Sequence, residues 1–132
     1  MLKRGVYAAS LSVLNKDLTL NVEATISHGE NLIKNGCTGV FFMGSTGQAQ
    51  LCSVDSKKEL ISKIASHKLK KRFFVGLGVN SLSDSISLIK YANEYEINKE
   101  ILIGAPAYYQ NNTDQGVFNF FKRIFLFVKF FL

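Results

Sequence analysis

The chain has 132 residues, of which 47% are hydrophobic and 20% are charged. This composition supports a hydrophobic core in a single domain and excludes an intrinsically disordered chain. The net charge is +6, which makes nucleic acid and membrane surfaces worth considering as partners. The dense basic cluster at residues 68–72 lies where a helix is expected to end, and no aromatic residues are interleaved with it to stack on bases. We therefore expect neither nucleic acid nor a membrane as a partner.

Cysteine and histidine usage predicts a reduced protein without a metal site. Cys37 and Cys52 have neither metal-ligand spacing nor a multi-bridge framework, and two free thiols are typical of the cytoplasm. His28 and His67 have no cysteine or acidic partner at ligand spacing, so both are expected on helix surfaces. Residues 1–7 lack the apolar core of a signal peptide. The sequence thus predicts a cytoplasmic protein with neither metal nor cofactor.

Apolar runs alternate with amphipathic stretches along the chain. The runs predict strands and the amphipathic stretches predict helices. The expected elements, in chain order, are a strand at Val6–Leu11, a helix at about Leu20–Lys34, a strand at Gly39–Met43, a helix at about Ser56–Ser66, a strand at Arg72–Gly76, a helix at about Ser83–Tyr95, a strand at Glu100–Gly104, and a helix entered through Thr113 or Asp114.

The spacing of the expected strands is regular. They start near residues 6, 39, 72 and 100, which gives steps of 33, 33 and 28 residues. Each step has the length of one βα unit. Strands that alternate with helices in this way predict an α/β fold with a parallel sheet and right-handed crossovers. In such folds ligands bind at the carboxyl ends of the strands.

Three loops at those carboxyl ends carry polar residues. In the stretch 44–47, glycines flank two hydroxyls, which allows a sharp turn and the close approach of a small anion. The loop 76–81 contains Asn80, and the next loop contains Tyr108 and Tyr109. Each loop alone is at least as compatible with a plain turn or plain packing as with a binding site. Together, at one edge of a sheet, they predict a site for a small polar ligand.

The C-terminal segment differs in composition from the rest. From Phe118 to Leu132 it is dominated by Phe and Lys, and the polar face of the expected helix disappears. The run is short for a membrane span and contains three cations. An A/T-rich message read out of frame has this composition. We hypothesise that about residues 121–132 are not native coding sequence, within a single domain covering residues 1–132.

The three loops, in this order, resemble the dihydrodipicolinate synthase / N-acetylneuraminate lyase family. The Gly-Thr-Thr-Gly-Glu loop of that family is similar to residues 44–48, its Gly-x-Gly-x-Asn-Ser/Thr loop to residues 76–81, and its Pro-Pro-Tyr-Tyr loop to residues 106–109. The resemblance covers about residues 4–121. It implies the N-terminal half, about four βα units, of a TIM (β/α)8 barrel. It also implies a class I aldolase or lyase, such as 4-hydroxy-tetrahydrodipicolinate synthase, that forms a Schiff base with pyruvate or a related α-keto acid.

The resemblance implies a role for each loop. Thr46 and the adjacent amides would bind the keto-acid carboxylate. Ser45 would supply one hydroxyl of a proton relay, and Tyr109 would be the relay tyrosine that in this family reaches into a neighbouring subunit. A homo-oligomer is therefore implied. The substrate-binding residues that it implies are Ser45, Thr46, Gly47, Asn80 and Tyr108.

The sequence also departs from the family pattern. Gln48 replaces the usual glutamate, and Val13 stands where proline is usual. The family's Schiff-base lysine ends the sixth strand, a context that this chain does not contain. Such a lysine must be buried with a lowered pKa, and no lysine here is expected to take the role. Three interpretations stay open: an enzyme truncated before its lysine and inactive as an isolated chain, a non-catalytic remnant, and a small α/β anion-binding module.

Overall fold

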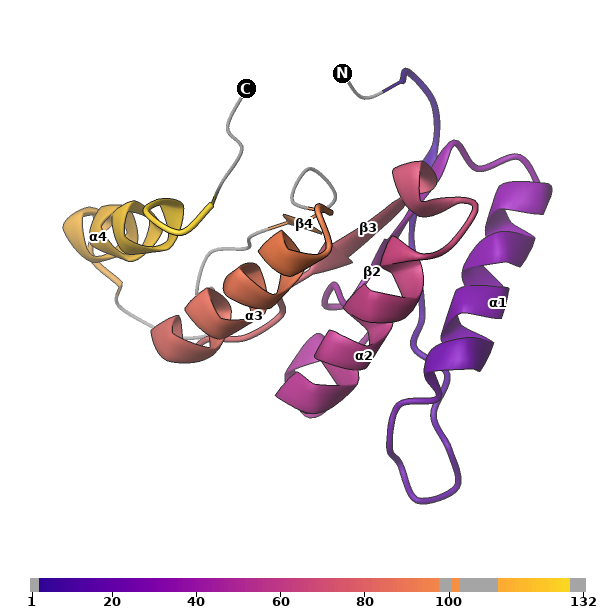
Figure 1. The fold of residues 1–132 in the computed structure, drawn as a ribbon, viewed down its shortest axis with the longest axis horizontal. Helices are drawn as coiled ribbons and strands as arrows, with labels where there is room; N and C mark the ends of the chain where they lie inside the picture. The colour runs from indigo at the N-terminus through magenta and orange to yellow at the C-terminus, as the bar shows by residue number, and fades with distance from the viewer. Residues whose placement is uncertain (1–2, 98–100, 103–111, 129–132) are drawn as a thin grey trace.

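The computed structural model describes residues 3–97, 101–102 and 112–128. Within these ranges the strands form one parallel sheet in the order β1-β2-β3-β4. Figure 1 shows α1, α2 and α3 side by side over the sheet, with α4 beside α3. The elements are β1 (Tyr7–Ala9), α1 (Val22–Lys34), β2 (Gly39–Phe42), the short 3-10 turn η1 (Ala49–Leu51), α2 (Val54–Ala65), the 3-10 turn η2 (Lys70–Arg72), β3 (Phe73–Gly76), α3 (Leu82–Glu94), β4 (Ile101–Leu102) and α4 (Asp114–Phe125).

The side chains of β2 and β3 alternate between the two faces of the sheet. Val40 and Phe42 are in register with Phe73 and Val75, and all four are at most 1% exposed. Phe42 lies against α1, because a Cβ at Gly29 would come within 2.4 Å of its ring. This face therefore forms the hydrophobic core between the sheet and the helices.

Three aromatic rings, from Tyr7, Phe41 and Phe74, lie on the opposite face. The rings of Tyr7 and Phe74 meet edge to face with centroids 5.8 Å apart. Phe41 packs over Gly76, where a Cβ would come within 2.9 Å of two ring carbons. Gly39 likewise leaves room for the Tyr7 ring. Both faces of the sheet are thus apolar, as expected for parallel strands.

Each helix begins at a polar residue that caps its first turn. In all four cases the N-cap side chain accepts a hydrogen bond from the backbone N–H three residues further on. Such a cap stabilises a helix by about 1 kcal/mol. The N-cap residues are Asn21, Ser53, Ser81 and Thr113. Of the two starts predicted for the fourth helix, Thr113 is therefore the cap.

The predicted elements are present in the predicted order, but several boundaries differ. β1 is shorter than the predicted Val6–Leu11. Leu20, predicted to begin the first helix, instead pairs with Leu14 in an isolated antiparallel bridge. β2 ends before Met43, because that residue has a φ of 57° and leaves the extended conformation. Arg72, predicted to begin the third strand, ends η2.

Arg72 fixes the start of β3. Its Nε donates a 2.8 Å hydrogen bond to the carbonyl oxygen of Thr38, and its Nη2 donates a 2.5 Å bond to that of Cys37. Both acceptors lie just before β2. Arg72, the last residue of the basic cluster at residues 68–72, thus ties two strands together where they begin. The role of the cluster at a helix end stays a prediction, since α2 ends at Ala65, before the cluster.

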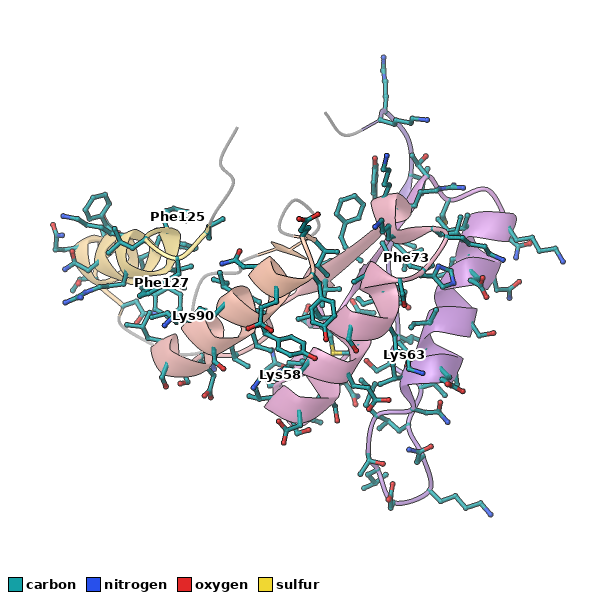
Figure 2. The ribbon with its side chains drawn as sticks, viewed as in Figure 1. Lys58, Lys63, Phe73, Lys90, Phe125 and Phe127 are labelled. Atoms are coloured by element: carbon teal, nitrogen blue, oxygen red, sulfur yellow. The ribbon has the colours of Figure 1, made fainter. Side chains whose placement is uncertain are left out.

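The segment after α3 is described in part. α4 packs against α3, and Ile124 is fully buried. The Nδ2 of Asn93 donates a 2.8 Å hydrogen bond to the carbonyl oxygen of Phe127, and the Lys90 ammonium lies 4.8 Å from the centre of the Phe127 ring (Figure 2). Within the described ranges, every helix is too short or too polar to cross a membrane. The non-native origin of about residues 121–132 stays a prediction.

Candidate functional site

The loop between β2 and α2 contains the predicted stretch 44–47 and turns sharply. Met43 and Gln48, on either side of it, have left-handed backbones with φ of 57° and 50°. This conformation costs a non-glycine residue about 1 kcal/mol or more. Ser45 and Thr46, between them, are exposed. Backbone strain around exposed polar residues is typical of functional loops.

This loop leaves several hydrogen-bond donors available. Backbone bonds from the N–H groups of Gln48 and Ala49 to carbonyls at the start of the loop close the turn. The amide groups of Ser45, Thr46 and Gly47, and the two hydroxyls, make no hydrogen bond within the described part of the chain. Consecutive unpaired amides beside hydroxyls are suited to bind one carboxylate or phosphate.

The loop after β1 supports Gly47. The hydroxyl of Ser12 donates a 2.6 Å hydrogen bond to the carbonyl oxygen of Gly47. A Cβ at Gly47 would lie 3.0 Å from the carbonyl oxygen of Ser10 and 3.1 Å from the Ser12 Oγ. Glycine therefore allows the close approach of the two loops at this point. Ser12 was not predicted as a site residue. The feature of the sequence that could have indicated it is a hydroxyl residue just after the first strand.

The loop between β3 and α3 lies against the loop that follows β2. Gly78 has a φ of 56°, and a Cβ there would lie 2.2 Å from the Cβ of Ala49 and 3.1 Å from the carbonyl oxygen of Met43. Asn80, two residues further on, is partly exposed, and its side chain makes no hydrogen bond to another described residue. The structure thus brings the loop that carries Asn80 into contact with the loop that carries Ser45.

Lys57 is a buried lysine beside these loops. It lies in the first turn of α2, is 1% exposed, and donates a 3.2 Å hydrogen bond from Nζ to the carbonyl oxygen of Gly78. Burial lowers the pKa of Lys57, while Cys52 and Asp84 act in the opposite direction. Lys57 was not predicted as a site residue. Its spacing of three residues from Leu60 places the two side chains on one face of the helix, and this pattern is visible in the sequence.

Lys57 meets two requirements of a Schiff-base lysine, burial and a lowered pKa. It does not meet a third, which is access. Its ammonium is enclosed and faces a backbone carbonyl, so a keto acid cannot reach it in this conformation. We therefore assign Lys57 no nucleophilic role.

Among the described residues, no group of three His, Cys, Asp or Glu side chains could hold a metal ion. Cys37 and Cys52 are free thiols, as predicted. Burial raises the pKa of Cys52, with Lys57 and Ser12 acting in the opposite direction.

Tyr108 and Tyr109 lie outside the described residues, so their predicted roles stay predictions.

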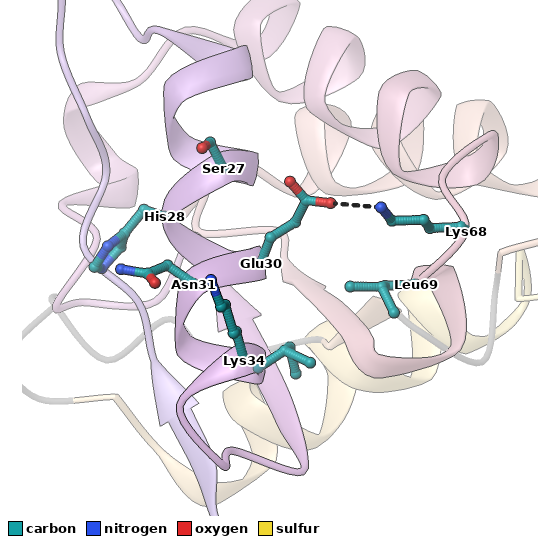
Figure 3. Close-up of a pocket in the computed structure, with 8 residues that line it drawn as sticks. Ser27, His28, Glu30, Asn31, Lys34, Lys68 and Leu69 are labelled. Carbon is teal, nitrogen blue, oxygen red and sulfur yellow. Dashed lines mark ion pairs between the residues drawn. The ribbon is translucent and has the colours of Figure 1, made fainter.

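A groove of about 560 Å³ lies between α1 and the turn after α2 (Figure 3). Its carboxylate, Glu30, is paired with the Lys68 ammonium at 3.5 Å, and the His67 Nε2 lies 3.3 Å from the same carboxylate. His67, predicted on a helix surface, lies beyond the end of α2 and packs on Phe73 with ring centroids 5.1 Å apart. The groove adjoins the amino ends of the strands, opposite the polar loops, so it is not the candidate site.

Comparisons with known proteins agree with this arrangement. Residues 2–128 match the Dihydrodipicolinate synthetase family. The 4-hydroxy-tetrahydrodipicolinate synthase of Methanococcus aeolicus is 32% identical over 122 residues, which cover 92% of this chain and 41% of that protein. The crystal structure of dihydrodipicolinate synthase from Agrobacterium tumefaciens is 27% identical, with a TM-score of 0.81, and covers 96% of this chain and 44% of that one. The N-acetylneuraminate lyase of Proteus mirabilis, at 19% identity and a TM-score of 0.82 over 97% of this chain and 43% of that one, shares the fold.

A parallel sheet in sequential order, with a polar loop cluster at the carboxyl ends of its strands, defines an α/β protein with a candidate anion site. The chain belongs to the dihydrodipicolinate synthetase family, which confirms the resemblance found in the sequence. It spans less than half the length of the relatives that it matches.

Proposed function

We propose that this chain supplies the carboxylate-binding part of a class I aldolase or lyase site for pyruvate or a related α-keto acid. The observation that carries the proposal is the set of unpaired donors at Ser45, Thr46 and Gly47, at the carboxyl end of β2. Membership of the dihydrodipicolinate synthetase family supports the reaction class. The matched relatives named 4-hydroxy-tetrahydrodipicolinate synthase support a member of that class.

We also propose that the described units form the first half of a (β/α)8 barrel. The parallel pairing of all four strands in sequential order supports this arrangement. So does the aromatic face opposite the helices, formed by Tyr7, Phe41 and Phe74, because the inside of a barrel is filled by side chains. In this arrangement the polar loops stand at the end of the barrel where active sites are found.

In the proposed site, Thr46 and the amides of residues 45–47 donate hydrogen bonds to the keto-acid carboxylate. Formation of a Schiff base releases water from a carbinolamine, so protons must move between hydroxyl groups. The Ser45 hydroxyl is exposed beside those amides and is suited to pass a proton. Asn80 and Tyr108 are proposed to contact the substrate. Tyr109 is proposed to complete the relay from a neighbouring subunit of a homo-oligomer.

An anion-binding module without catalysis is the second candidate. It is favoured by the enclosure of Lys57, since the buried lysine of the described residues is not accessible to a ligand. Binding of a carboxylate needs the loop donors and does not need a nucleophile. The two candidates therefore differ in whether the bound keto acid forms a covalent bond with the protein.

Calorimetric titration with pyruvate tests the shared part of both candidates. Thr46→Val keeps the shape of the side chain and removes its hydroxyl, so we expect about tenfold weaker binding. Ser62→Ala is the control, because the Ser62 hydroxyl bonds to the carbonyl of Glu59 within its own helix. Methyl pyruvate, which lacks the carboxylate, should not bind. Equal binding of pyruvate and its methyl ester would contradict the proposal.

Borohydride reduction in the presence of pyruvate tests whether this chain contains a nucleophile. A reduced adduct, detected by intact mass, would support a Schiff-base enzyme and would contradict the assignment of no nucleophilic role to Lys57. We expect pyruvate binding without an adduct, because Lys57 is enclosed, and that result fits both a chain that supplies the carboxylate-binding part alone and an anion-binding module.

A further inference from the structure

We propose that Lys57 is a positioning residue that holds the loop carrying Asn80 in place beside the loop of residues 44–47. The inference deepens the proposed function and rests on it, because the two loops together would form the keto-acid site. The contact that carries it is the 3.2 Å hydrogen bond from the Lys57 Nζ to the carbonyl oxygen of Gly78. This bond joins residues 21 positions apart and links α2 to the loop after β3.

The environment of Lys57 shows why a simple packing role does not account for it. The side chain is 1% exposed, and burying an ammonium is costly unless hydrogen bonds and charges compensate. The charge that acts on it at neutral pH is that of the Asp84 carboxylate, in the first turn of α3. Methionine would fill a similar volume without that desolvation cost. We therefore attribute the presence of a lysine at this buried position to its hydrogen bond with the Gly78 carbonyl group.

Gly78 is held by two separate contacts. Its left-handed backbone packs directly on Ala49, so it already sets the distance between the two loops. The hydrogen bond from Lys57 adds a constraint on the orientation of the Gly78 carbonyl. Asn80 follows two residues later, and Ser81 then caps α3. Asn80 thus lies between two fixed points, the Gly78 carbonyl and the helix cap.

The test compares two neighbouring lysines of α2. Lys57→Met removes the buried donor. Lys58→Met is the matched control, since the Lys58 ammonium also reaches towards α3 but lies over the Tyr91 ring, 5.7 Å from its centre (Figure 2). Backbone NMR order parameters and pyruvate affinity are measured for both variants and the wild-type chain.

We expect Lys57→Met to lower the order parameters of Val79 and Asn80 from the rigid range of about 0.85 to below about 0.6. Those of Leu88, in the buried face of α3, should stay unchanged, and pyruvate binding should weaken about tenfold. Lys58→Met should match the wild-type chain in all three. A uniform change across α3 and the loop, or no change in the loop, would overturn the positioning role.

The outcomes separate this proposal from the proposed function. If the wild-type chain does not bind pyruvate, the proposed function fails, while the order parameters still test the contact between Lys57 and Gly78. If borohydride traps pyruvate on Lys57, the residue is a nucleophile and the positioning role is wrong. If Lys57→Met does not fold, the wild-type chain is titrated with pH. The chemical shift of the Gly78 carbonyl carbon must then change over the same pH range as that of the Lys57 Nζ, because the two groups are hydrogen-bonded. Changes over two different pH ranges would overturn the proposal.

Discussion

The hydroxyl of Ser12 donates a 2.6 Å hydrogen bond to the carbonyl oxygen of Gly47, so the loop after β1 holds the candidate anion loop after β2. The two residues are 35 positions apart. Gly47 has little room for a side chain, because a Cβ would lie 3.0 Å from the carbonyl oxygen of Ser10. The position of the loop donors therefore depends on a neighbouring βα unit.

Ser12→Ala should loosen the candidate site. It leaves a partly buried carbonyl oxygen without its donor, so we expect the free energy of unfolding to fall by about 1–2 kcal/mol in urea denaturation. Pyruvate affinity should fall as well. Ser62→Ala, whose hydroxyl bonds within α2, should stay within about 0.5 kcal/mol of the wild-type chain. Unchanged stability and affinity in Ser12→Ala would show that the contact does not support the loop.

Substitutions at two glycines should separate backbone strain from steric contact. Gly36→Ala places alanine at a φ of 102° with nothing within 4 Å, so we expect a loss of about 1 kcal/mol from strain. Gly78→Ala adds a Cβ that would lie 2.2 Å from that of Ala49. It should cost at least about 2 kcal/mol in urea denaturation, because a tightly packed site adds about 1–3 kcal/mol to the strain. Equal losses in the two variants would mean that the loops are not in contact at Gly78.

Arg72 should not be replaceable by lysine. Its guanidinium bonds to the carbonyl oxygens of Thr38 and Cys37 through two different nitrogens, and an ammonium cannot reproduce that fork. We expect Arg72→Lys to lower the midpoint of thermal unfolding by several degrees, for a loss of about 1–2 kcal/mol. Lys71→Met, at the exposed neighbouring position, is the control. An Arg72→Lys midpoint equal to that of the control would contradict this assignment.

The parts of the fold that could be predicted are those whose pattern of residues lies within one short stretch of the sequence. α2 was predicted because Leu60, Ile61 and Ile64 repeat at helical spacing, and all three are at most 1% exposed. The candidate loop was predicted because glycines and hydroxyls follow an apolar run. Strand ends were less accurate, since nothing in the residue type shows that Met43 adopts a left-handed backbone.

The supporting contacts of the site could not be predicted in the same way. Ser12 bonds to Gly47, and Lys57 bonds to Gly78. In both cases a polar side chain bonds to a backbone carbonyl of a different βα unit, and such a contact leaves no periodic pattern in the sequence. The position of Lys57 on the apolar face of α2 was visible, but the carbonyl that it reaches depends on the packing of two loops.

Lys57 should also affect stability at alkaline pH. Its pKa is lowered from 10.5, so between the lowered pKa and 10.5 the unfolded chain binds more protons than the folded chain. Its contribution to the free energy of unfolding therefore rises as pH increases through that range. Cys52, whose pKa is raised from 9.0, acts in the opposite direction above pH 9.0. The stability of the wild-type chain minus that of Lys57→Met should thus rise with pH towards 10.5, and a flat or falling difference in urea denaturation would contradict the burial of a charged lysine.

The most direct test of the candidate site is to map the amides that respond to pyruvate by NMR. We predict that the largest chemical-shift changes occur at Ser45, Thr46 and Gly47, with smaller changes at Asn80, and that methyl pyruvate does not produce them. Changes that are centred on the groove beside Glu30, or that are equal for pyruvate and its methyl ester, would contradict the assignment of residues 44–47 as a carboxylate-binding loop.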